Sequence, residues 1–168
     1  MGGGPWSSLG LLLTYYYFIK IFGPKLMKNR KPFDLRWLMI IYNFSMVILS
    51  AWMFTQGCQL LNYGLDAWEC QVIDYTLTTS QTMQLIQIGW IFFISKLIEL
   101  LDTIFFVLRK KSEQVTNLHV IHHTVVPIAV WFGLKFAPGG YNTFFPFLNS
   151  FVHIIMYFYY GLAAFGPK

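Results

Sequence analysis

The chain has 168 residues, of which 56% are hydrophobic, 20% aromatic and only 11% charged. Soluble domains carry about a quarter charged residues, so this composition excludes an ordinary soluble domain. It predicts an all-α fold, a polytopic bundle of helices embedded in a membrane. The net charge of +5 could indicate nucleic-acid binding. The basic residues, however, cluster in short runs between apolar segments, which is typical of membrane proteins and argues against nucleic acid.

Apolar runs predict one domain over residues 1–168 with about five spans. In chain order they are 9–22, 37–54, 83–108, 118–136 and 143–165. The connection 23–36 carries five Lys/Arg and the connection 56–81 carries none, so the positive-inside rule places the basic loops in the cytosol. Cys58 and Cys70 then face the other side, where disulfides persist. The two cysteines could pair with each other, pair with a cysteine elsewhere, or stay free.

The fourth predicted span begins with LHVIHHT, which holds three of the four histidines in the chain. His119, His122 and His123 are spaced i, i+3 and i+4, so a helix places all three imidazoles on one face. Thr116 or Asn117 is expected to cap this helix. Three imidazoles on an otherwise apolar helix indicate a functional site rather than packing.

The third predicted span contains SKLIELLDT, in which Lys96, Glu99, Asp102 and Thr103 share one helical face. A charge at bilayer depth costs about 2.5–3.5 kcal/mol, and Lys96 and Glu99 are spaced to pair along the helix. One interpretation is a structural patch of paired charges that faces the bundle interior. The other interpretation is a functional site, which is the usual explanation for ionisable groups within a membrane.

The fifth predicted span contains NSFVHIIMYFYY, in which His153, Tyr157 and Tyr160 follow the spacing i, i+4 and i+7. These side chains therefore share a helical face. At about 1.5 Å of rise per residue, the polar faces of the last three spans lie at similar depth, roughly 8–12 Å below their cytosolic ends. We expect the three faces to form one intramembrane site.

Three elements carry a family resemblance: KLIELLDT, HVIHH and HIIMYFYY. They resemble, in this order, the KxxExxDT, HxxHH and HxxMYxYY elements of the very-long-chain fatty acid elongases, and the resemblance covers nearly the whole chain. It implies a multi-pass protein of the endoplasmic reticulum membrane with about seven spans. It also implies an acyltransferase that condenses a long-chain acyl-CoA, polyunsaturated ones included, with malonyl-CoA to a 3-ketoacyl-CoA two carbons longer, releasing CO2 and CoA.

The resemblance implies no cofactor and no metal, since acyl-CoA and malonyl-CoA are substrates. The expected partners are membrane lipid and the ketoacyl-CoA reductase, dehydratase and enoyl reductase of the elongation cycle; self-association is left open. With about five spans here, we expect the chain to be incomplete at its C-terminus.

The chemistry of acyl transfer suggests a role for each candidate catalytic residue. His122 is expected to attack the acyl-CoA and form an acyl-imidazole, because desolvation in an apolar bundle favours the neutral ring. His119, His123, His153 and Tyr157 would position the reactants and stabilise the enolate from malonyl-CoA. Glu99 and Asp102 would orient the imidazoles, and Lys96 would neutralise the carboxylates. The expected substrate-binding residues are Lys28, Arg30, Lys110, Lys111, Asn149 and Tyr160.

Three alternatives remain at this point. An iron-dependent membrane desaturase or hydroxylase could use the histidines of HxxHH as metal ligands. Such sites have larger arrays of histidines, however, whereas this chain has four histidines. A transport protein could line a proton pathway with the intramembrane charges. A fragment without catalytic activity is the third alternative.

Overall fold

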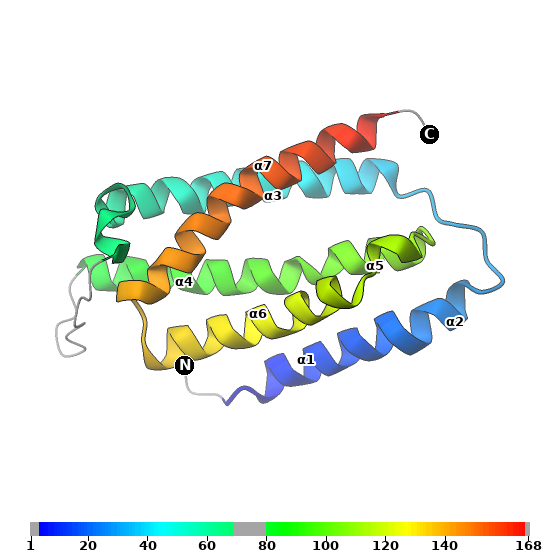
Figure 1. Ribbon diagram of the computed structural model, residues 1–168, viewed down its shortest axis with the longest axis horizontal. Coiled ribbons are helices and arrows are strands. Elements are labelled where there is room, and N and C mark those ends of the chain that lie inside the picture. Colours follow the sequence, from blue (N-terminus) through cyan, green and yellow to red (C-terminus); the bar gives the residue numbers. More distant parts are fainter. Residues whose placement is uncertain (1–3, 69–79, 167–168) are drawn as a thin grey trace. The chain divides into compact units, whose positions relative to one another are not determined.

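The computed structural model describes residues 4–68 and 80–166 (Figure 1). Every element in these two ranges is helical, which confirms the predicted all-α class. In chain order the elements are α1 (Trp6–Tyr17), η1 (Phe18–Phe22), α2 (Gly23–Met27), α3 (Arg36–Leu60), η2 (Asn62–Trp68), α4 (Ser80–Ile98), α5 (Leu100–Leu108), η3 (Ser112–Gln114), α6 (Asn117–Phe136), η4 (Gly140–Thr143) and α7 (Phe144–Phe165). Cys70 lies outside the described residues and Cys58 is half-buried in α3, so the disulfide alternatives stay as they were.

The chain divides into two compact units, each of which combines two separate stretches of sequence. The first unit comprises Met1–Leu35 and Phe93–Phe132, and the second comprises Arg36–Phe92 and Gly133–Lys168. The first unit therefore contains α1, the end of α4, α5 and most of α6. The second contains α3 and α7.

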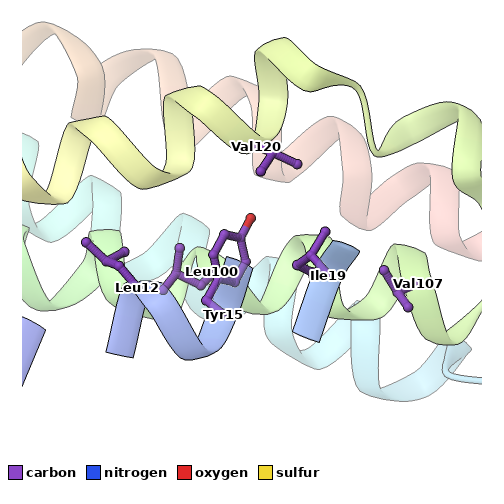
Figure 2. Close-up of a cluster of buried hydrophobic side chains, with 6 residues drawn as sticks. All are labelled: Leu12, Tyr15, Ile19, Leu100, Val107 and Val120. Atoms are coloured by element: carbon purple, nitrogen blue, oxygen red, sulfur yellow. The ribbon is translucent and has the colours of Figure 1, made fainter. Parts of the chain in front are cut away.

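The core of the first unit is a cluster of apolar side chains from three helical segments (Figure 2). Its members are Leu12, Tyr15, Ile19, Leu100, Val107 and Val120. The first three are spaced i, i+3 and i+7, so they lie on one face of the first helical segment. Burial of one such side chain stabilises the fold by about 1.5–3 kcal/mol, and the cluster thus holds α1, α5 and α6 together.

The second unit is built on the packing of α3 along α7. Phe54 of α3 stacks on Phe147 of α7 with ring centroids 4.9 Å apart. Gly57 makes room for the Phe147 ring, because a Cβ at this glycine would lie 2.7 Å from Phe147 Cδ2. Small residues allow helices in membrane proteins to approach closely in this way.

The structure differs from the predicted spans at two places. The first helical segment does not end at Phe22: it continues through η1, a π-helical stretch, into α2, so the predicted basic loop begins as helix. Pro24 does not break the helical segment. It lies in the first turn of α2, where a proline is tolerated because the backbone N–H that it lacks is not needed there.

The third predicted span, 83–108, ends at Leu108 as expected but is not one continuous helix. It is interrupted at Glu99 between α4 and α5. Here the Asp102 N–H donates to the Glu99 carbonyl oxygen at 3.1 Å, which is the tighter i to i+3 turn. The interruption therefore falls within the element that the sequence marks as chemically special.

The apolar outer faces of the helices indicate a membrane protein. In the described part of the chain, α3 and α7 are long and apolar enough to cross a bilayer. Large apolar side chains on both remain exposed, among them Trp37, Ile48, Ile155 and Leu162. Apolar surface of this extent marks a surface that contacts lipid or another protein. The count of five spans stays a prediction.

Candidate functional site

The three histidines of LHVIHHT lie in the first two turns of α6 and form a continuous group of rings. The ring centroids of His119 and His123 are 4.3 Å apart, and those of His122 and His123 are 5.4 Å apart. His119 and His123 are half-buried, whereas His122 is exposed. The predicted common face is confirmed, and His122 is its most accessible member.

A hydroxyl fixes the start of this helix. The backbone N–H of His119 donates to Thr116 Oγ1 at 3.2 Å, which is the bond that an N-cap residue makes. Of the two residues that the sequence left open, Thr116 is therefore the cap. The imidazoles consequently project from a helix end whose first turn is fixed.

The charges of SKLIELLDT are arranged as the spacing predicted. Lys96 Nζ lies 2.7 Å from Glu99 Oε1, and the two residues are only 3% and 2% exposed. A buried ion pair repays the cost of desolvation only where its geometry is good, as it is here. Asp102 is half-buried on α5.

Thr103 connects α5 to both α1 and α6 and is fully buried. Its Oγ1 lies 2.9 Å from His119 Nε2 and accepts a hydrogen bond from the Tyr15 hydroxyl at 2.8 Å. The sequence placed Thr103 on the correct face without a role. It did not single out Tyr15, because most neighbouring positions in LLLTYYYFI are apolar or aromatic as well and no pattern marks the buried face.

Lys20 is a second residue to which the sequence assigned no partner in the site. Its Nζ donates to Asn117 Oδ1 at 2.9 Å, so η1 is tied to the first residue of α6. Lys110 Nζ donates to the Lys28 carbonyl oxygen at 3.4 Å. Arg30 and Lys111 are exposed. The contacts of these basic residues with CoA stay a prediction.

The predicted polar face of α7 lies in the second unit. His153 and Tyr157 are buried, with ring centroids 5.4 Å apart, and Tyr42 of α3 meets Tyr157 edge-on at 6.0 Å. Tyr160 is exposed and its ring centroid lies 6.4 Å from that of Tyr157, while Asn149 is half-buried. That this face forms one site with the α4–α6 residues stays a prediction.

Comparison with known proteins identifies the family. The family model described as ELO: GNS1/SUR4 matches residues 1–168, the whole chain. The chain belongs to this family. The resemblance drawn from the three sequence elements is therefore confirmed.

Named members of the family are similar to nearly the entire chain. It is 48% identical to very long chain fatty acid elongase 7 of Drosophila melanogaster, over 98% of this chain and 50% of the relative. It is also 48% identical to very long chain fatty acid elongase 1 of Homo sapiens, over 98% of this chain and 59% of the relative. Human very long chain fatty acid elongase 4 is 43% identical, over 97% of this chain and 51% of the relative. The chain thus spans about half the length of these relatives.

Proposed function

We propose that the protein condenses a long-chain acyl-CoA with malonyl-CoA to a 3-ketoacyl-CoA two carbons longer. The single observation that carries this proposal is the histidine group on α6, whose accessible ring is backed by two packed rings. The printed names of the relatives, very long chain fatty acid elongases, support the same chemistry. The ELO membership favours it over the iron-dependent and transport alternatives.

The first step of the proposed reaction is acyl transfer to His122. A lone-pair nitrogen of the neutral imidazole attacks the thioester carbonyl, an N–acyl bond forms, the C–S bond breaks and CoA leaves as the thiolate. His122 suits this role because it is exposed, so a thioester can reach it. The His123 ring packs against the His122 ring and the His119 ring packs against His123, so the movement of the His122 ring is limited.

The second step uses malonyl-CoA as the carbon nucleophile. Loss of CO2 leaves an enolate, whose carbon attacks the carbonyl of the acyl-imidazolium and returns the electron pair to the ring nitrogen, so the neutral His122 imidazole is restored. The enolate requires stabilisation of negative charge by hydrogen-bond donors or cations. His123 on α6 is proposed for this function, as are His153 and Tyr157 from the sequence pattern of α7.

The Lys96–Glu99 pair is proposed to support the imidazoles rather than to react. The Lys96 ammonium neutralises the Glu99 carboxylate, so the pair places little net charge within the apolar bundle. Glu99 also lies at the interruption between α4 and α5. A change at this carboxylate is therefore expected to alter the direction in which α5 leaves α4.

The cellular setting is part of the proposal. We place the protein in the endoplasmic reticulum membrane with its basic connections on the cytosolic side, where Lys28, Arg30, Lys110 and Lys111 meet the CoA phosphates. The 3-ketoacyl product then requires reduction, dehydration and a second reduction, so the partners are enzymes of these three reaction classes.

A condensation assay tests the proposed function. The protein in lipid nanodiscs receives a long-chain acyl-CoA and malonyl-CoA labelled in the malonyl group, and the lipid products are identified by mass. We expect a labelled 3-ketoacyl-CoA from the wild-type protein and none from His122→Ala. A His122→Ala protein that condenses at the wild-type rate would remove His122 from the nucleophile's role. A folded wild-type protein that forms no product would contradict the reaction itself.

A further inference from the structure

The hydroxyls of Tyr15 and Thr103 form a hydrogen-bonded chain that ends on a histidine of the site. Tyr15 donates to Thr103 Oγ1 at 2.8 Å, and Thr103 Oγ1 lies 2.9 Å from His119 Nε2. The three residues come from α1, α5 and α6, and all three belong to the first unit. The chain therefore ties one imidazole to two other helices.

The surroundings of Tyr15 require its hydroxyl proton to be donated. Tyr15 is 5% exposed and its ring packs in the apolar cluster, with the hydroxyl turned toward the helix that carries Val120 (Figure 2). Among the residues that the structure describes, Thr103 is the one hydrogen-bond partner of this hydroxyl. A buried hydroxyl proton without an acceptor costs free energy, so the Tyr15 proton points to Thr103 Oγ1.

The direction of the second hydrogen bond follows from the first. Thr103 has one hydroxyl proton and, within the described part of the chain, two hydrogen-bond partners for its side chain. The Thr103 oxygen has a second lone pair that could accept from His119, but that arrangement would leave the buried Thr103 proton without an acceptor among the described residues, so the proton is assigned to His119 Nε2. The reverse order, in which His119 donates to Thr103 and Thr103 to Tyr15, would leave the Tyr15 proton without an acceptor.

We propose that Tyr15 and Thr103 are positioning residues, which hold the neutral His119 ring in the tautomer with a bare Nε2 and the proton on Nδ1. The proposal rests on the function proposed above and assigns His119 a supporting part in it. Its Nε2 lone pair is engaged by Thr103, so it does not attack a thioester through that atom. Its ring instead packs against His123 at 4.3 Å and fixes the rings beside it.

The tautomer can be measured without turnover. The 168-residue chain with ¹⁵N-labelled histidine is placed in lipid nanodiscs, and the His119 nitrogens are assigned from the signals lost in His119→Asn. We expect a single wild-type tautomer with a bare Nε2, and a mixture of tautomers in Thr103→Val. A protonated Nε2 in the neutral wild-type ring, or an unchanged tautomer in Thr103→Val, would overturn the proposal.

Kinetics provide a second readout that a loss of packing alone would not reproduce. In the condensation assay, Thr103→Val is expected to lower kcat by about tenfold to a hundredfold with KM nearly unchanged, because small displacements of catalytic groups have effects of this size. Thr103→Ser, which keeps the hydroxyl, should recover most of the rate. Tyr15→Phe should lower kcat less, and Tyr15→Phe combined with Thr103→Val should be no slower than Thr103→Val alone.

A matched control separates the effect of breaking the Tyr15–Thr103–His119 hydrogen bonds from a general effect of removing a hydroxyl. Thr14 is the neighbour of Tyr15 on α1, is exposed, and donates to the Gly10 carbonyl oxygen of its own helix at 2.8 Å. Thr14→Val should therefore leave kcat and the His119 tautomer unchanged. Additive losses in the double variant, or equal losses in Thr103→Ser and Thr103→Val, would contradict the positioning role. Absence of condensation by the wild type would contradict the proposed function. The tautomer measurement would then remain as the test of the positioning role of Tyr15 and Thr103.

Discussion

The two units of the protein are held together by different kinds of contact. In the first unit, directional hydrogen bonds link separate helices: Tyr15 to Thr103, Thr103 to His119, and Lys20 to Asn117. In the second unit, α3 and α7 meet through aromatic rings and the glycines that admit them, and the Arg36 guanidinium donates to the Phe165 carbonyl oxygen. Hydrogen bonds fix the orientation of a side chain, whereas ring packing mainly fixes the distance between helices. Under the proposed function, the hydrogen bonds of the first unit are therefore expected to orient the histidines of α6.

The largest effect should follow from removing the carboxylate of the buried ion pair. Glu99→Ala leaves the buried Lys96 ammonium without the carboxylate it contacts at 2.7 Å, and such losses destabilise proteins by about 3–5 kcal/mol. The free energy of unfolding in mixed micelles, followed by circular dichroism, measures this change. Hydrogen exchange should increase in α5 and α6 more than in α3 and α7, because the pair belongs to the first unit.

A double variant provides the control for the ion pair. Lys96→Met combined with Glu99→Leu removes both charges and keeps apolar volume, so it should recover most of the stability lost in Glu99→Ala. Glu113→Ala, at an exposed carboxylate in η3, should change stability very little. If Glu99→Ala is no more destabilising than Glu113→Ala, the ion pair does not hold the first unit together.

A smaller effect is expected in the second unit, where a single methyl group tests the ring packing. Gly57→Ala introduces a Cβ 2.7 Å from Phe147 Cδ2, and this ring stacks on Phe54. Overpacking of this kind costs about 1–3 kcal/mol. Thermal unfolding of the same protein in micelles measures the loss.

The matched control for Gly57 is Gly10 in α1, where an added Cβ meets nothing within 4 Å. Gly10→Ala should raise stability by about 0.5–1 kcal/mol, because alanine is favoured over glycine inside helices. Equal effects of the two substitutions would show that α3 and α7 do not approach as closely as the structure has them.

The smallest effect concerns the helix that carries the histidines. Thr116→Ala removes the oxygen that accepts the His119 N–H, and loss of an N-cap costs about 0.5–2 kcal/mol. Condensation activity should fall with the stability of the first turn of α6. Thr14→Ala, which removes a hydroxyl bonded within its own helix, should show neither loss. Identical melting curves for Thr116→Ala and wild type would contradict the cap.

The sequence predicted the features that depend on helical spacing. The common face of the three histidines, the Lys96–Glu99 pair and the His153–Tyr157 face all follow from residues one turn apart on one helix. Such pairs are determined by local geometry, which is the same in every α-helix. Apolar composition was likewise enough to predict the all-α class.

Contacts between separate helices could not be predicted in the same way. The Tyr15–Thr103 hydrogen bond joins residues 88 positions apart, and no local pattern indicates which tyrosine of the YYY run reaches α5. The interruption at Glu99 was missed because its sequence, LIELLDT, has no Gly or Pro to mark it. These features depend on tertiary packing, which can override local preferences.

The acylation half-reaction tests the central claim, that the histidine group on α6 carries out acyl transfer, most directly. The protein in nanodiscs is mixed with a long-chain acyl-CoA in the absence of malonyl-CoA, and released CoA and the mass of the His122 peptide are measured. The account predicts a stoichiometric release of CoA and an acyl group on His122, with neither in His122→Ala. Release of CoA only when malonyl-CoA is present, or an acyl group on a residue outside the histidine group, would contradict it.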